Sequence, residues 1–142
     1  MDSGELSSSL RSVISGLHKG LRKQTSAVGT YSMTELETIG HLFRNPTLLP
    51  TELAVLTRIT TQSMSQILTK METQHVIKRT PSKEDKRKVL ISLTSNGKKL
   101  VEKNLYEKDE WLKNVIEKTL TDKERELLAK VIPVLNKLIE IK

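Results

Sequence analysis

The hydrophobic pattern of this chain has a helical period almost everywhere and changes to a period of two in one place. Val89, Ile91 and Leu93 occupy every second position, as in a half-buried strand. Elsewhere the apolar residues recur every three or four positions, which is the spacing of one face of a helix. The 142 residues suit a single domain, or two small lobes that share a core. The pattern therefore predicts a mainly α protein with one small β-hairpin.

Polar caps and prolines mark the boundaries of the first helices in the middle of the chain. Ser32 and Glu35 have the spacing of a capping box and open a helix that reaches Phe43. Asn45-Pro46 ends this helix. Pro50 suits the first turn of a short helix. The residue before it is a leucine rather than a polar cap, so the start of this helix is weakly specified.

A further helix and the hairpin follow after a tight turn. Thr60 is a good N-cap for a helix that reaches about Thr73. Two helices joined by a tight turn are typical of a helix-turn-helix. A first strand begins at Val76-Ile77, and the turn-forming composition of Pro81–Asp85 connects it to the strand at 89–93.

Long amphipathic helices are expected on both sides of this middle region. Thr94 caps one that begins at Ser95, and Thr121 with Glu124 forms a capping box for the last one. Pro133 lies inside the last helix and is expected to kink it. The outer apolar stripes are too large for a small middle lobe to cover, so we expect them to pack on one another and on a second subunit. The residues predicted for this dimer contact are Leu6, Leu10, Val13, Leu17, Leu128, Ile132, Leu135 and Ile139.

The predicted fold is a winged helix-turn-helix core flanked by N- and C-terminal dimerisation helices. Residues 32–94 are expected to form the winged helix-turn-helix lobe, with the hairpin as its wing. Residues 1–31 and 95–142 are expected to form the dimerisation lobe.

The net charge of +7 is concentrated in one part of the chain. Residues 78–99 hold eight basic and two acidic side chains, whereas residues 51–77 and 100–142 are each balanced. A local excess of this kind attracts a polyanion and steers its approach. The alternative is a face that only increases solubility. The basic residues are Lys78, Arg79, Lys83, Lys86, Arg87, Lys88, Lys98 and Lys99.

The helix predicted after Thr60 has an apolar stripe opposite a face of uncharged polar groups. Exposed helix faces are usually Glu and Lys, and Ser and Thr are poorer helix formers. A glutamine amide can bond adenine N6 and N7 together, and Ser or Thr can meet several base edges. We therefore expect this face to read bases in the major groove, with a neutral solvated face as the alternative. The buried stripe is Met64, Ile67, Leu68 and Met71. The residues expected to contact DNA are Thr61, Gln62, Ser63, Ser65, Gln66, Thr69 and Lys70.

The hairpin supplies a second set of expected DNA contacts. Arg87 suits the narrow and strongly negative minor groove of A·T-rich DNA. Asp85 can hold its guanidinium by a bidentate pair and fix its direction, although such a pair can also serve only to tie the turn. The expected phosphate contacts, which set affinity rather than sequence choice, are Lys83, Lys86 and Lys88.

Composition excludes several other classes of function. The chain has no cysteine, which removes disulfides and thiolate chemistry. It has no apolar run long enough for a membrane span and no basic segment followed by an apolar stretch at its start, so we expect a cytoplasmic, nucleoid-associated protein. His18, His41 and His75 fall in different elements and lack both metal-ligand spacing and a nucleophile. No enzyme, metal or cofactor is expected.

Several motifs resemble the MarR family of bacterial and archaeal winged-helix transcription regulators. They are Glu52-Leu53-Ala54, Thr60 through Ile67, Asp85-x-Arg87, and Leu93-Thr94-x-x-Gly97. The resemblance implies a homodimer with interlocked terminal helices and two recognition helices in successive major grooves of a pseudo-palindrome. It also implies repression relieved by a small organic ligand, often an anionic aromatic.

Carried onto this sequence, the family pattern assigns base reading to Gln62, Ser63, Ser65 and Gln66, and the wing-tip arginine to Arg87. Two positions depart from the pattern. The arginine often seen on the recognition helix is Gln66 here, so a preference for guanine is not carried over. The family usually has Gly after the recognition helix, where a left-handed backbone is wanted, and this chain has His75. The absence of cysteine excludes the family's thiol-oxidation switch.

A rival interpretation from another class is a dimeric winged-helix module that binds proteins without reading DNA. Salt dependence separates the two. A DNA reader loses affinity steeply with salt, by a slope of about −0.9 per phosphate contact. A protein-binding wing would show a shallow slope and tolerate the loss of Arg87.

Overall fold

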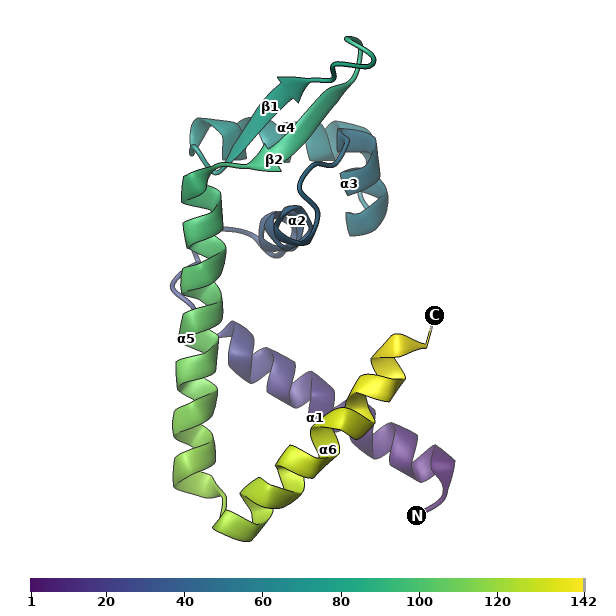
Figure 1. Ribbon diagram of the computed structural model, residues 1–142, viewed down its shortest axis with the longest axis vertical. Helices are drawn as coiled ribbons and strands as arrows, with labels where there is room; N and C mark the ends of the chain where they lie inside the picture. The colour runs from purple at the N-terminus through teal and green to yellow at the C-terminus, as the bar shows by residue number, and fades with distance from the viewer. Residues whose placement is uncertain (142) are drawn as a thin grey trace. The chain divides into compact units, whose positions relative to one another are not determined.

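The computed structural model describes residues 1–141, in which six helices and a two-stranded antiparallel sheet are present (Figure 1). The fold class expected from the sequence, mainly α with a small β-hairpin wing, is confirmed. In chain order the elements are α1 (Ser3–Arg22), α2 (Met33–Arg44), α3 (Pro50–Thr57), α4 (Thr61–Thr73), β1 (Ile77–Pro81), β2 (Val89–Leu93), α5 (Ser95–Thr119) and α6 (Asp122–Glu140).

The chain divides into two compact units. The winged-helix unit is Thr25–Tyr106, and the terminal-helix unit joins Met1–Gln24 to Glu107–Lys142. The winged-helix unit contains the predicted lobe 32–94 and extends beyond it at both ends. The reason is that Tyr31 and the first turns of α5 supply side chains that pack against its core.

The core of the winged-helix unit is aliphatic and lies between α2, α3, α4 and one face of the hairpin. The stripe predicted on α4 is buried at Met64, Leu68 and Met71, while Ile67 is partly buried at the edge of the core. Figure 1 shows α4 alongside the hairpin, which it contacts through β1. The other buried members of the core are Ile39, Leu42, Leu53, Ala54, Val76, Ile77, Ile91 and Leu93.

The register of the hairpin decides which side chains face α4. Ile77 pairs with Leu93, and Arg79 pairs with Ile91. Ile77 and Ile91 are buried in the core, so Arg79 lies on the same inner face of the sheet. A backbone bridge between Leu48 and Ile91 adds the segment before α3 to the free edge of β2.

The connection from α4 to β1 is fixed by the start of α5. His75 has a left-handed backbone with φ 60°, as expected for the position at which the family pattern has glycine. The Thr94 hydroxyl donates to the His75 carbonyl at 2.5 Å and accepts from the Gly97 N–H at 3.1 Å. A Cβ on Gly97 would lie 2.3 Å from the Val76 carbonyl oxygen, so α5 can start this close to the strand only with glycine there.

The terminal-helix unit leaves its apolar faces uncovered. Neither α1 nor α6 has a buried residue. A close contact joins α1 to α5, because a Cβ on Gly20 would lie 2.9 Å from the Trp111 ring. α6 continues past Pro133 to Glu140. Of the predicted dimer residues, Leu10 and Leu135 are partly buried, and the exposed ones are Leu6, Val13, Leu17, Leu128, Ile132 and Ile139. Across residues 1–141, no helix has both the length and the apolar composition needed to cross a membrane.

Candidate nucleic-acid interface

The turn between α3 and α4 sets the direction of α4 relative to α3. Arg58 caps α3 with a left-handed backbone, φ 59° and ψ 42°, a conformation usually given to glycine at helix ends. Ile59 then packs against the core. The Thr60 hydroxyl accepts a hydrogen bond from the Ser63 N–H at 3.0 Å, which confirms the predicted N-cap. The exposed side of α4 is therefore anchored at its first turn.

This exposed side, termed the reading face, consists of the uncharged residues 61, 62, 63, 65, 66 and 69. Gln62, Ser65 and Gln66 are exposed, and within residues 1–141 their side chains make no hydrogen bond. The Ser63 hydroxyl, in contrast, accepts a hydrogen bond from Thr60 at 2.9 Å. The two glutamine amides and the Ser65 hydroxyl thus keep their donors and acceptors available for another molecule.

Lys70, one of the residues expected to contact DNA, forms an ion pair with an acidic residue of α2. Its Nζ lies 2.6 Å from Glu35 Oε1, and the Glu35 side chain is 3% exposed. Glu35 also accepts the Ser32 N–H, which completes the capping box of α2. The Lys70 ammonium is thereby paired at the start of α2, while its side chain is 55% exposed, and its contact with DNA stays a prediction.

The pKa of Glu35 reflects this pairing. Burial by itself would raise the pKa, but the bonds from Lys70 and Ser32 outweigh it and hold the pKa below its ordinary value. Glu35 is therefore an anion at neutral pH. Losing either partner would leave a buried charge without compensation.

Thr69 is also engaged inside the protein. Its hydroxyl donates to the Ser65 carbonyl at 2.9 Å and accepts from Arg79 Nη2 at 3.2 Å. Arg79 Nε lies 3.4 Å from a carboxylate oxygen of Glu72. The hydroxyl of Thr69 is therefore not free to donate to a base, and the role predicted for it is limited to its methyl group and remaining lone pair.

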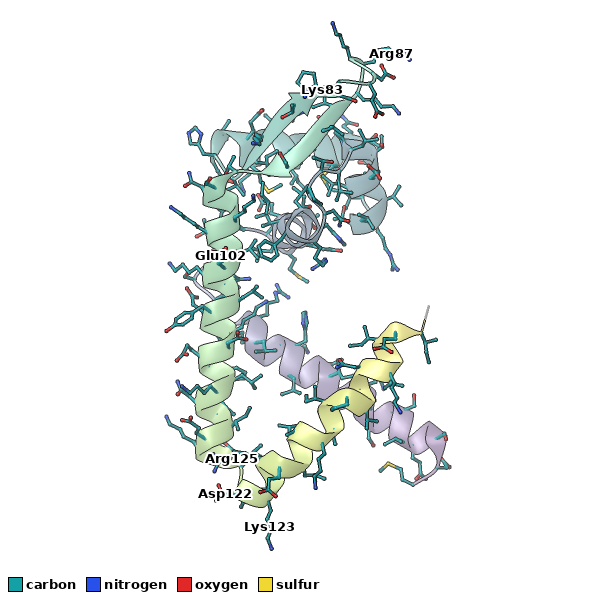
Figure 2. All side chains as sticks on the ribbon, in the orientation of Figure 1. Lys83, Arg87, Glu102, Asp122, Lys123 and Arg125 are labelled. Carbon is teal, nitrogen blue, oxygen red and sulfur yellow. The ribbon has the colours of Figure 1, made fainter. Side chains whose placement is uncertain are left out.

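The tip of the hairpin carries the predicted bidentate pair between Asp85 and Arg87. Arg87 Nε and Nη2 donate to the two carboxylate oxygens at 3.1 and 3.3 Å. These bonds, with one from the Arg87 backbone N–H, hold the pKa of Asp85 below its ordinary value. The Arg87 side chain is nevertheless 90% exposed. Figure 2 shows Arg87 and Lys83 on the loop between β1 and β2.

The loop that carries the lysines is held by its own backbone. The Ser82 N–H donates to the Lys88 carbonyl, and the Lys88 N–H donates to the Asp85 carbonyl, both at 2.9 Å. Lys83, Lys86 and Lys88 are exposed, and no side-chain hydrogen bond or ion pair holds them in the described part of the chain. Free positive charge is thus located on the wing, whereas both charged side chains inside α4 are paired.

Sequence reasoning missed Glu35, Arg58 and Arg79 as residues that set the geometry of this surface. A signal existed only for Arg79, because the period of two places it on the same face of β1 as Ile77. Glu35 looked like an ordinary capping residue. Arg58 gave no signal, since a left-handed backbone is typical of Gly, Asn or Asp.

A helix-turn-helix with a free amide and hydroxyl face, followed by a hairpin with exposed cations at its tip, defines a winged helix-turn-helix protein of the nucleic-acid-binding type. Residues 31–88 match the sequence model described as the MarR family, and the fold matches transcriptional regulators over nearly the whole chain. The winged-helix part of the chain is therefore similar to the MarR family, and the whole chain has the fold of a winged-helix transcriptional regulator.

Solved structures give the extent of this similarity. A transcriptional regulator from Pseudomonas aeruginosa shares 27% identity and a TM-score of 0.81, with 97% of this chain and 96% of that chain covered. NadR in complex with 4-hydroxyphenylacetate shares 28% identity and a TM-score of 0.62, covering 94% and 92%. A mutant of S. aureus MepR bound to an oligodeoxyribonucleotide shares 23% identity and a TM-score of 0.70, covering 94% and 97%. Comparison with curated proteins gave no match.

Proposed function

We propose that this protein is a homodimeric repressor of transcription that reads a pseudo-palindromic DNA operator. The observation that carries the proposal is that two kinds of side chain lie on different parts of the winged-helix unit. Gln62, Ser65 and Gln66 present unbonded donors and acceptors on α4, and the exposed cations lie on the hairpin. Base edges need the first kind of group and phosphates the second. The DNA-bound MepR structure has the same fold, which supports this assignment.

The homodimer is supported by the uncovered apolar faces of the terminal-helix unit. Leu17 on α1 and Ile132 on α6 are each 49% exposed, within stripes of similar residues. Contiguous apolar faces of this kind usually mark an interface. In a two-fold dimer the same patch is used by both subunits, so a palindromic operator matches the symmetry of the protein.

We further propose that a small organic ligand relieves repression. NadR, at 28% identity, was solved with 4-hydroxyphenylacetate, which makes this compound a reasonable first probe. Adding it to the protein–operator complex should lower the affinity for DNA. An unchanged affinity at millimolar ligand would count against this particular class of ligand.

The experiment that tests the function is selection of binding sites from random duplexes by the purified protein. The expected result is a two-fold symmetric motif whose half-sites are about one duplex turn apart. The affinity for the selected site should fall with salt by a slope of about −0.9 for each phosphate contact. Failure to enrich any motif, together with a shallow salt slope, would favour the protein-binding alternative.

Gln66→Ala is expected to relax base choice at one position in each half-site. The amide would be lost from the reading face while the helix keeps its caps and its buried stripe. The cost on the selected duplex should be about 1–3 kcal/mol, measured by fluorescence anisotropy with every base tested at each position. Equal losses on selected and random duplexes would show that Gln66 does not read a base.

Arg87→Ala is expected to weaken binding most at sites with A·T-rich flanks, because a guanidinium is favoured in a narrow minor groove. Lys83→Ala serves as the control, since its loss should reduce affinity for all duplexes alike. Binding is compared on operators that differ only in their flanks. If the deficit of the Arg87 variant did not depend on flank composition, the minor-groove assignment would be wrong.

A further inference from the structure

Arg79 occupies a position between the wing and the helix that reads DNA. It pairs with Ile91 across the hairpin, on the inner face of β1 that packs on α4. The side chain is 30% exposed. The strand therefore directs this guanidinium along the surface of α4 and not toward open solvent.

The guanidinium makes two contacts with α4. Nη2 donates to the Thr69 hydroxyl at 3.2 Å, and Nε lies 3.4 Å from Glu72 Oε1. Nε is shielded from solvent and, among the described residues, has no hydrogen bond of its own, so the nearby carboxylate is what compensates its charge. The planar group thus joins two side chains that lie three positions apart on one helix.

Each contact has a consequence for the surface presented to DNA. Glu72 is the one acidic residue in α4, and an unpaired carboxylate there would repel phosphates. Thr69 closes the C-terminal end of the reading face, and its hydroxyl is held by Arg79 and by the Ser65 carbonyl. Arg79 therefore neutralises the acid and fixes the last side chain of the reading face.

We propose that Arg79 is a positioning residue for sequence-specific DNA binding, acting through Thr69 and Glu72 without touching a base. The proposal rests on the proposed function, because it concerns how α4 is presented to an operator. The contact with Thr69 gives Arg79 a role in base choice, which the wing lysines lack, and the pairing with Glu72 adds affinity for any duplex.

The test compares Arg79→Ala with Thr80→Ala in the full-length protein. Thr80 is the next residue of β1 and is exposed on the opposite face of the hairpin. Arg79→Ala should lower affinity for the selected operator about tenfold, as expected for a residue coupled to its neighbours in one network, with a smaller loss on a random duplex. Thr80→Ala should leave both affinities unchanged.

Glu72→Gln in the Arg79→Ala background distinguishes positioning from direct phosphate contact. Because Arg79 neutralises Glu72, removing the acid should restore the affinity for the random duplex and part of the affinity for the operator, and the salt slope should stay as in the wild type. A phosphate contact predicts a slope shallower by about 0.9 and no rescue by Glu72→Gln; either result would overturn the proposal.

Two further variants keep the test decisive. Arg79→Lys retains the charge but not the two-armed geometry, and should recover binding to the random duplex more fully than binding to the operator. If Arg79→Ala does not fold by circular dichroism, Arg79→Lys alone decides, and equal operator affinity in it and in the wild type would refute the proposal. A wild-type protein that prefers no duplex would instead refute the proposed function.

Discussion

Replacing Ile132 with glutamate should convert the protein into a monomer in solution and lower its affinity for the operator by about 100-fold or more. Ile132 is 49% exposed on α6, and a carboxylate in an apolar interface would be desolvated without a partner. A monomer can hold only one half-site, so the gain from binding two linked half-sites is lost. Sedimentation and anisotropy on the same samples measure the two effects.

Lys130→Glu is the matched control for this variant. It introduces the same side chain two positions earlier on α6, which is about 200° around the helix from Ile132, at a position that is already charged. It should stay dimeric, with only a small loss of DNA affinity. The wild type should also unfold at a higher temperature as its concentration rises. A concentration-independent midpoint with an unchanged Ile132 variant would show that these faces do not form a dimer.

Gly97→Ala should destabilise the winged-helix unit by about 2–3 kcal/mol, the cost of an added methyl where there is no room. The new Cβ would approach the Val76 carbonyl oxygen to 2.3 Å and the Leu93 side chain to 3.0 Å. Backbone must therefore move, and with it the bond from Thr94 to His75 that joins α5 to the end of α4. Thermal and urea unfolding measure the loss.

Gly40→Ala supplies the comparison, because it makes the same change within a helix of the same unit. A Cβ there would meet only the flexible end of the Arg44 side chain, at 3.6 Å. Alanine is the better helix former, so stability should rise by up to about 1 kcal/mol. Similar losses from both substitutions would mean that the close contact at Gly97 is not what requires glycine.

Local features of the fold could be predicted from the sequence. The stripe of Met64, Leu68 and Met71 follows from a period of 3.6, and the N-cap at Thr60 follows from hydroxyl chemistry. The left-handed backbone at His75 could be expected once the motif around it was recognised. Each of these depends on a few neighbouring residues, whose spacing is visible in the chain itself.

The pairings across the winged-helix unit could not be predicted in the same way. The distance between Glu35 and Lys70 depends on how α2 packs against α4, and 34 residues separate them in the chain. Lys70 therefore looked like a free cation beside the reading face. Arg79 looked like one more charge of the basic stretch, because nothing local indicates that its guanidinium reaches Thr69.

The start of α3 is stabilised by neighbouring residues, because the residue at its N-cap position has no polar side chain. Leu49 cannot cap a helix with its side chain, so the sequence specified this start weakly. In the folded chain, the Glu52 carboxylate accepts the Leu49 N–H at 2.9 Å, and Pro50 takes the first turn. Half of a capping box is sufficient here because Leu53 is fully buried in the next turn.

The charges of α4 are paired, and those of the wing lysines in the loop 82–88 are not. We therefore expect the affinity for DNA and the choice of DNA sequence to depend on different residues. Substituting a wing lysine should alter the affinity for any duplex and leave the preferred motif as it was. Substituting an amide on α4 should alter the preferred motif and hardly change the affinity for random DNA. On the proposed function, we therefore expect that the strength of DNA binding can be changed without changing the preferred sequence.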